Sequence, residues 1–299
     1  MKNNYLIRKG IGFFVCLLIL VFILVINDLR TDKDRDPNQT LGSPEDAKNT
    51  VNKINDGLTM LDVLKVAKLS LNQMEIGLSD YTARFVKQEL DANAEMPKES
   101  EMFIKVQTRF REDRTEAPRR IYLRFNKPDS LDGREVIWGE DLYSGKMAVH
   151  EVGLILGLKT LWLDPDGFIA MQGQRHPISE IGIVKLTEQL IEQGEKDLSN
   201  QQMRITRDLE HSFDGVRVHL ITIQRLNSGE SKDDFYQAEI IFDPLRQLIL
   251  AFRSFSAPES EDKTPALIES YAYYDLKTNV GLSDEDFNTA NSKYSFPDF

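Results

Sequence analysis

Two pairs of basic residues are the strongest candidates for polar chemistry in this sequence. Arg124 and Arg134 flank a turn rich in charged residues, and Arg175 and His176 stand directly before a predicted helix. An arginine guanidinium can form two parallel hydrogen bonds to a carboxylate or phosphate, and the free N–H groups at a helix N-terminus favour an anion. These four residues are therefore candidates for anion binding. Two alternatives stay open: a cross-strand salt bridge for the first pair and an ordinary capped loop for the second.

The sequence lacks the common catalytic signatures. It contains no G-x-S-x-G, S-x-x-K, H-E-x-x-H or glycine-rich phosphate-binding motif, and its four histidines do not have the spacing of zinc ligands. We therefore expect a protein that is not an enzyme and that uses no cofactor or metal. A hydrolase that uses His150, or the charged cluster from Asp129 to Glu135, is the weakest alternative.

The composition is that of a globular protein. Of the 299 residues, 41% are apolar and 28% are charged, which excludes collagen-like, mostly disordered and polytopic membrane proteins. The formal net charge is -11. Because nucleic-acid binding requires a basic surface, this charge argues against a nucleic-acid partner.

An apolar block near the N-terminus predicts export. Residues 1–10 carry three basic side chains and no acidic one, and residues 11–29 are mostly apolar without a small-residue cleavage pattern. This order is typical of a cytoplasmic n-region followed by an uncleaved signal anchor, a transmembrane helix. The polar stretch 30–56 predicts a disordered tether. We expect a single-pass inner-membrane protein with its domain, 57–299, in the periplasm; cleavage and release to the periplasm is the alternative.

Alternation of apolar and polar residues predicts about eleven β-strands. They are centred on 81–85, 102–107, 120–125, 134–140, 146–152, 159–163, 203–213, 216–226, 235–242, 247–255 and 267–276. An antiparallel sheet of this length does not lie flat. We therefore expect an α+β fold, mainly antiparallel β, in which one curved sheet forms a half-barrel.

Two amphipathic helices are predicted to cover this sheet. The first has an apolar stripe that includes Leu61 and Leu64, with Thr59 and Asp62 as a capping box and Gly77 as its end. The second is predicted from Pro177, which suits a first helical turn, to a stop at Gly194.

Apolar side chains on the first three strands are candidates for lining a ligand cavity. By default they form a packed core beneath the helices, but in a half-barrel the same face lines a cavity. These candidate ligand-binding residues are Tyr81, Phe85, Ile104, Val106, Leu123 and Phe125.

Several segments together resemble an uncharacterised family of exported bacterial proteins, a domain of unknown function common in planctomycete-like genomes. The motifs that carry the resemblance are YLRFNKPD at 122–129, GREV at 133–136, RHPI at 175–178, EIG at 180–182 and DLKTNVGL at 275–282. The resemblance covers roughly residues 58–297.

The order of elements, a helix followed by a long antiparallel meander, is more distantly similar to the periplasmic lipoprotein carriers of the LolA type. That resemblance implies an open half-barrel whose apolar concave face, covered by helices, takes acyl chains. We therefore expect a membrane-tethered periplasmic domain of unknown function that binds a lipid or the acyl chain of a lipoprotein. The alternative is an envelope scaffold or interaction module with a filled core.

Overall fold

The computed structural model describes most of the domain that follows the predicted tether. The described residues are 57–90, 97–111, 116–153, 156–199, 202–226, 235–258, 260 and 263–297. The predicted anchor at 11–29 and tether at 30–56 lie outside them. Among the helices of this described part, none is both long enough and apolar enough to cross a membrane.

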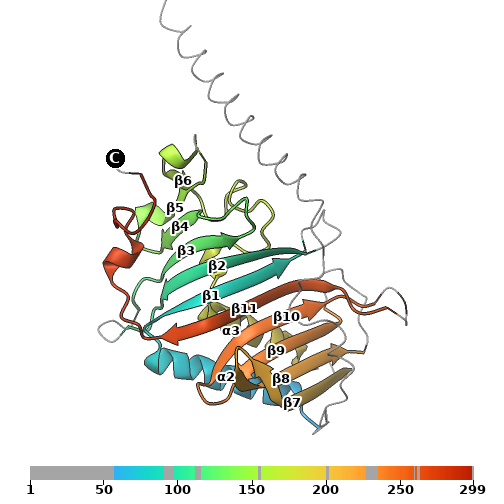
Figure 1. Ribbon diagram of the computed structural model, residues 1–299. Coiled ribbons are helices and arrows are strands. Elements are labelled where there is room, and N and C mark those ends of the chain that lie inside the picture. Colours follow the sequence, from blue (N-terminus) through green and yellow to red (C-terminus); the bar gives the residue numbers. More distant parts are fainter. Residues whose placement is uncertain are drawn as a thin grey trace, which may run out of the picture. The chain divides into compact units, whose positions relative to one another are not determined.

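Eleven strands form one antiparallel sheet, as the alternating pattern predicted (Figure 1). They are β1 (Asp80–Glu89), β2 (Lys98–Gln107), β3 (Arg120–Lys127), β4 (Glu135–Gly139), β5 (Met147–His150), β6 (Leu161–Leu163), β7 (Met203–Phe213), β8 (Val216–Arg225), β9 (Gln237–Asp243), β10 (Leu248–Phe255) and β11 (Leu267–Thr278). The spatial order is β6-β5-β4-β3-β2-β1-β11-β10-β9-β8-β7. The sheet is thus two meanders joined along β1 and β11.

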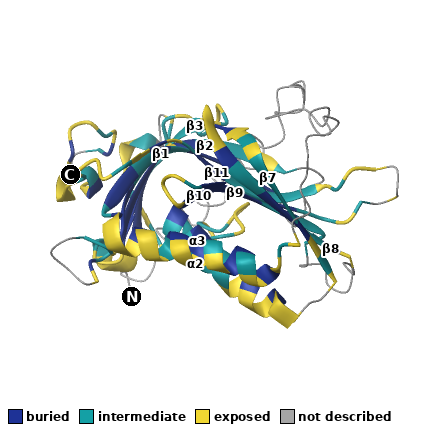
Figure 2. Ribbon diagram, turned by 90° about the horizontal axis from the view of Figure 1, so that it is seen from below, coloured by how far each residue is buried: buried dark blue, intermediate teal, exposed yellow. Residues whose placement is uncertain are grey.

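The two α-helices of the described part lie inside the curve of the sheet (Figure 2). They are α2 (Met60–Gly77) and α3 (Ile183–Lys196). Strands β6 and β7 occupy opposite edges, so the chain between them must cross the sheet, and α3 lies on that route. Eleven strands are about 48 Å wide and α3 is about 21 Å long, so further residues beside the helix take part in the crossing.

Short 3-10 turns complete the described structure. They are η2 (Tyr143–Gly145), η3 (Leu156–Leu158), η4 (Ile178–Glu180), η5 (Asp197–Ser199) and η6 (Asp284–Phe287).

Helix α2 begins and ends as its sequence predicted, but its buried face differs in part. Thr59 and Asp62 form the expected capping box, and Gly77 is the last helical residue. Leu64 is buried as expected, whereas Leu61 is 53% exposed. The buried face of the helix therefore includes the smaller residues Val63 and Ala67 in place of Leu61.

Both predicted ends of the second helix were wrong. The chain from Pro177 forms the turn η4, and α3 starts only after Gly182, whose φ of 128° interrupts helical geometry. Gly194 lies within α3 instead of ending it. A Cβ at Gly194 would lie 2.8 Å from Leu64 of α2, so this glycine permits a close approach of the two helices.

Two buried tyrosines hold the N-terminus of α3 to the centre of the sheet. The N–H of Gly182 donates to the Tyr273 hydroxyl oxygen at 3.1 Å, and the N–H of Ile183 donates to the Tyr81 hydroxyl oxygen at 3.0 Å. The first N–H groups of a helix have no partner within the helix. Strands β1 and β11 therefore supply the cap that glycine lacks.

A buried ion pair holds the other end. Arg225, near the end of β8, donates through one guanidinium nitrogen to both carboxylate oxygens of Asp197, at 2.6 and 2.8 Å. Asp197 follows α3 directly, and both side chains are at most 10% exposed. Helix α3 is thereby fixed to the sheet at both ends.

The tyrosine caps predict a specific loss of stability. Tyr273→Phe leaves the buried Gly182 N–H without its acceptor, so the free energy of unfolding should fall by about 1–3 kcal/mol in urea denaturation. The neighbouring Tyr274→Phe is the matched control, because the Tyr274 ring stacks on Phe213 and lies under Arg84. Equal stability of the two variants would contradict the capping role.

Candidate functional site

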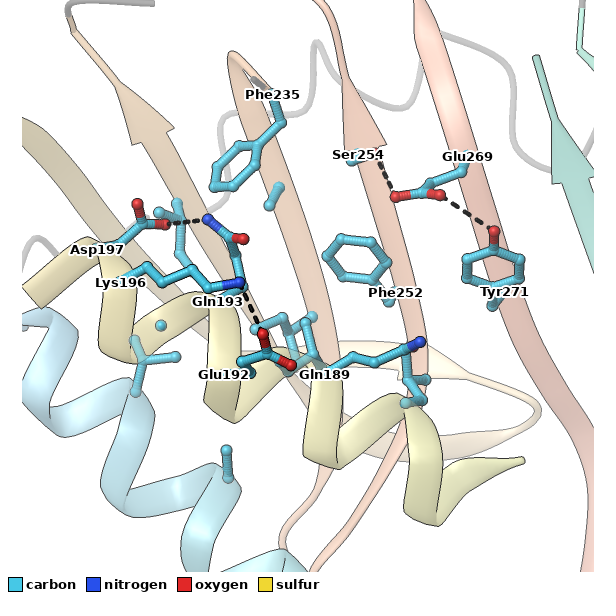
Figure 3. A pocket seen from close by; sticks show the side chains of 18 of the residues that line it. Gln189, Glu192, Gln193, Lys196, Asp197, Phe235, Phe252, Ser254, Glu269 and Tyr271 are labelled. Atoms are coloured by element: carbon cyan, nitrogen blue, oxygen red, sulfur yellow. Dashed lines mark hydrogen bonds and ion pairs between the residues drawn. The ribbon is translucent and has the colours of Figure 1, made fainter. Parts of the chain in front are cut away.

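A cavity of about 320 Å³ lies between the two helices and strands β8 to β11 (Figure 3). Its apolar lining comes from both helices and from the inner face of these strands. The apolar residues are Met60, Val63, Leu64, Ala67, Leu186, Leu190, Ile223, Phe235, Ala238, Ile240, Phe252 and Ile268. The volume is at the lower end of the range typical of small-molecule sites.

A polar cluster forms one wall of the cavity, where β11 begins and β1 ends. The Glu269 carboxylate accepts a hydrogen bond from the Ser254 hydroxyl at 3.3 Å, and it shares the single proton of the Tyr271 hydroxyl, at 3.1 Å, with Glu89, at 2.9 Å. Arg175 Nε lies 3.2 Å from the same carboxylate. Burial alone would raise the pKa of Glu269, but the hydrogen bond from His176 and the charge of Arg175 hold it below its usual value.

His176 joins the loop before α3 to this wall. Its Nδ1 lies 2.8 Å from Glu180 and its Nε2 lies 3.5 Å from Glu269. A protonated imidazole donates from both nitrogens, whereas a neutral one donates from a single nitrogen. The hydrogen bond to Glu269 is the main reason that the pKa of His176 is raised above 6.5; burial opposes the rise and Glu180 adds to it.

The opposite end of the cavity contains the Arg225–Asp197 pair. The Gln193 amide donates to Asp197 at 3.3 Å, and Lys196 donates to Glu192 at 2.7 Å (Figure 3). The Arg225 guanidinium also lies 4.1 Å from the centre of the Phe235 ring. A hydrocarbon-like interior thus has polar groups at both ends.

The apolar residues proposed from the first three strands lie elsewhere. Tyr81, Phe85, Ile104, Val106 and Leu123 are at most 4% exposed in the core, and Phe125 packs against it. None of these six is among the described residues that line the larger cavity. Phe85 borders a smaller cavity of about 30 Å³, next to His176. The inner face is therefore filled under β1 to β3 and open under β8 to β11.

The four proposed anion-binding residues occupy two separate places, each beside carboxylates. Arg124 lies 3.9 Å from Asp132, and Arg134 lies 2.8 Å from Glu151. Arg175 and His176 lie together, as their adjacency requires, and both contact Glu269.

Of the residues named for the weakest alternative, a hydrolase, Glu135 and His150 lie against the C-terminal segment, whereas Asp129 and Asp132 are exposed. Glu135 is 2% exposed and accepts hydrogen bonds from the Tyr122 hydroxyl and the Ser295 N–H. The ring of His150 lies against Phe296. Within the described part of the chain, no group of three or more histidine, cysteine or acidic side chains has an arrangement that could hold a metal ion.

Sequence reasoning missed the cavity-lining residues of the second meander. Phe235, Ala238, Ile240 and Phe252 belong to predicted strands, but the sequence did not assign any of them to a ligand cavity. The sequence did not show that a cavity lies between the helices and these strands.

The position of His176 predicts a pH-dependent contribution to stability. Because its pKa is raised in the folded state, its contribution is complete below about 6.5 and is lost as pH rises through the folded pKa. The difference in free energy of unfolding between the wild type and His176→Asn should therefore shrink from about pH 5 to about pH 9. His211→Asn is the control with the opposite slope, because burial lowers the pKa of His211. A pH-independent difference for His176→Asn would contradict this assignment.

Solved structures that resemble this chain have low sequence identity to it. A putative outer membrane lipoprotein-sorting protein domain from Vibrio parahaemolyticus is 13% identical, with 77% of this chain and 97% of that chain covered and a TM-score of 0.34. A LolA superfamily protein from Nitrosomonas europaea is 8% identical, with 74% and 97% covered and a TM-score of 0.30. The MucA/MucB complex of Pseudomonas aeruginosa is 13% identical, with 75% and 60% covered and a TM-score of 0.40.

No curated protein matches the chain. A family model described as a protein of unknown function, DUF1571, matches residues 78–296. This range runs from the end of α2 to the C-terminal segment and agrees with the family resemblance found in the sequence motifs. The chain therefore belongs to the DUF1571 family of proteins of unknown function.

Proposed function

We propose that this domain is a binding protein, not an enzyme, and that it holds an apolar chain in the cavity between α2, α3 and β8 to β11. The observation that carries the proposal is the cavity itself, which has a volume of about 320 Å³ and has apolar side chains at half of its lining positions. Burying apolar surface contributes about 25 cal/mol per Å². An alkyl or acyl chain is the ligand class that gains most from such a lining.

Polar contacts at both ends of α3 support the proposal that the cavity stays open. An apolar void normally collapses when its walls can move together, since close contact improves dispersion energy. Here Tyr81 and Tyr273 fix one end of α3, and the Asp197–Arg225 pair fixes the other. The helix cannot settle onto Phe252 without breaking a buried polar contact.

The proposed setting is the periplasmic side of the inner membrane. The sequence supports it through the basic n-region and the apolar block, which are typical of a signal anchor. In this setting the ligand is a lipid or the acyl part of a lipoprotein, and the polar tether lets the domain reach it.

Exposed apolar residues favour a second candidate function, an interaction module of the envelope. Between β6 and α3, Phe168 is 76% exposed and Ile169 is 59% exposed. Exposed apolar patches often mark protein interfaces.

If this surface binds a partner, the double variant Phe168→Ser and Ile169→Ser should lose the partner that is crosslinked to the wild type in membranes. The same variant should keep any bound lipid. Retention of the crosslinked partner would argue against this role.

Filling the cavity should abolish ligand binding without unfolding the domain. Ala238→Phe on β9 projects a ring into the cavity, so binding of a fluorescent fatty-acid analogue to the delipidated full-length protein should fall at least about tenfold. The control is Gln237→Phe, because neighbouring residues in a strand face opposite sides of the sheet.

Two results would contradict the proposal. One is an undiminished signal from a folded Ala238→Phe variant, which would place the probe elsewhere. The other is absence of both probe binding and co-purified lipid in the wild type, measured by native mass spectrometry.

A further inference from the structure

The charges around the cavity are arranged in pairs. Arg225 is bound by Asp197, and Arg175 lies against Glu269. Lys196 lies 2.7 Å from Glu192, but both of these side chains are more than 60% exposed, so solvent screens this pair. The pairs that matter for a bound ligand are the two less exposed ones.

Glu269 occupies the position that a ligand anion would take. Its carboxylate contacts Arg175, His176 and the hydroxyl groups of Tyr271 and Ser254, and its side chain is only 17% exposed. The carboxylate of a bound fatty acid would form ion pairs and hydrogen bonds with the same groups. The Glu269 carboxylate therefore already fills the anion position beside Arg175 and His176.

The wider cluster is electrically balanced. When His176 is protonated, the positive groups on this wall are Lys87, Arg175 and His176, and the negative groups are Glu89, Glu180 and Glu269. Lys87 lies 3.0 Å from Glu89, and the Arg175 N–H donates to Glu89 at 3.1 Å. An additional anion would leave one carboxylate without its partner in a partly buried site, which is unfavourable.

Neutral polar groups also line the cavity beside these pairs. They are the side chains of Gln189, Gln193, Ser254 and Tyr271 (Figure 3), and each donates a hydrogen bond to a carboxylate. Their hydroxyl and amide oxygens can still accept a hydrogen bond from an uncharged head group without displacing a charge.

We propose that Glu269 is a specificity residue that makes the cavity select amphiphiles with an uncharged, hydrogen-bonding head group over fatty-acid anions. This inference rests on the proposed function, since it requires that an apolar chain binds in the cavity. It replaces the anion-binding role suggested for Arg175 and His176, because an internal carboxylate already satisfies these cations.

A competition between two probes that differ only in head group tests the inference. Delipidated full-length protein is incubated with equimolar dodecanol and dodecanoate at about pH 8, where the carboxylate is ionised, and native mass spectrometry counts the two adducts. The wild type should bind dodecanol at least about tenfold more than dodecanoate. Glu269→Gln should raise the dodecanoate adduct about tenfold, because it frees the Arg175 guanidinium to pair with the ligand.

Control variants separate the local effect from a general change of charge. Glu239→Gln removes a carboxylate that pairs with Arg253. Glu239 lies between Ala238 and Ile240, which both line the cavity, so its own side chain faces the other side of the sheet. This variant should leave the ratio of dodecanol to dodecanoate adducts unchanged. Arg175→Gln removes a cation beside Glu269 and should lower the dodecanoate adduct further.

The failures of the inference and of the proposed function are distinguishable. A wild type that binds dodecanoate as well as dodecanol overturns the inference and leaves the binding function standing, and this comparison needs no variant to fold. Absence of both adducts from the wild type overturns the binding function and the inference with it.

Discussion

Helix α3 is held across the inside of the sheet by polar contacts at its two ends, and the cavity depends on this attachment at both ends. At the start, the hydroxyl groups of Tyr81 and Tyr273 accept the N–H groups that no residue of the helix can cap. At the end, Arg225 of β8 holds Asp197. Because both contacts are buried, breaking either one to close the cavity would leave a polar or charged group without a partner.

The position of α3 also explains why two residues in this part of the chain are glycine. At Gly182 a Cβ would lie 2.9 Å from the Tyr81 hydroxyl, and the φ of 128° strains other residues. Gly194 lets α3 approach Leu64 of α2, so the two helices pack as one layer. That layer packs against β10, and the cavity lies between the layer and strands β8 to β11.

Local features of the fold could be predicted from the sequence, because strand alternation and the Thr59–Asp62 capping box depend on neighbouring residues. The pairing of β1 with β11 could not be predicted, since it joins residues such as Tyr81 and Thr278 that lie at opposite ends of the domain. The end of α3 was wrong for the same reason: Gly194 has the local pattern of a helix stop, but its role is set by Leu64 of another helix.

The candidate site shows a similar limit. Arg175 and His176 were recognised as a basic pair, but Glu269, which satisfies them, lies on the last strand and has no sequence signal that links it to them. Likewise, Phe85 and Phe252 both belong to alternating strands, and only the position of the helices decides that one is packed in the core and the other borders a cavity.

The central claim is that an apolar chain occupies the space between α3 and the second meander. The most direct test is a crystal structure of the protein with an alkyl alcohol that carries bromine at its far end, located by the anomalous signal of the bromine. The account predicts one bromine peak among Leu190, Phe252 and Ile240, with the hydroxyl end near Tyr271 or Gln193. A bromine peak only on the outer surface, with the cavity empty, would contradict it.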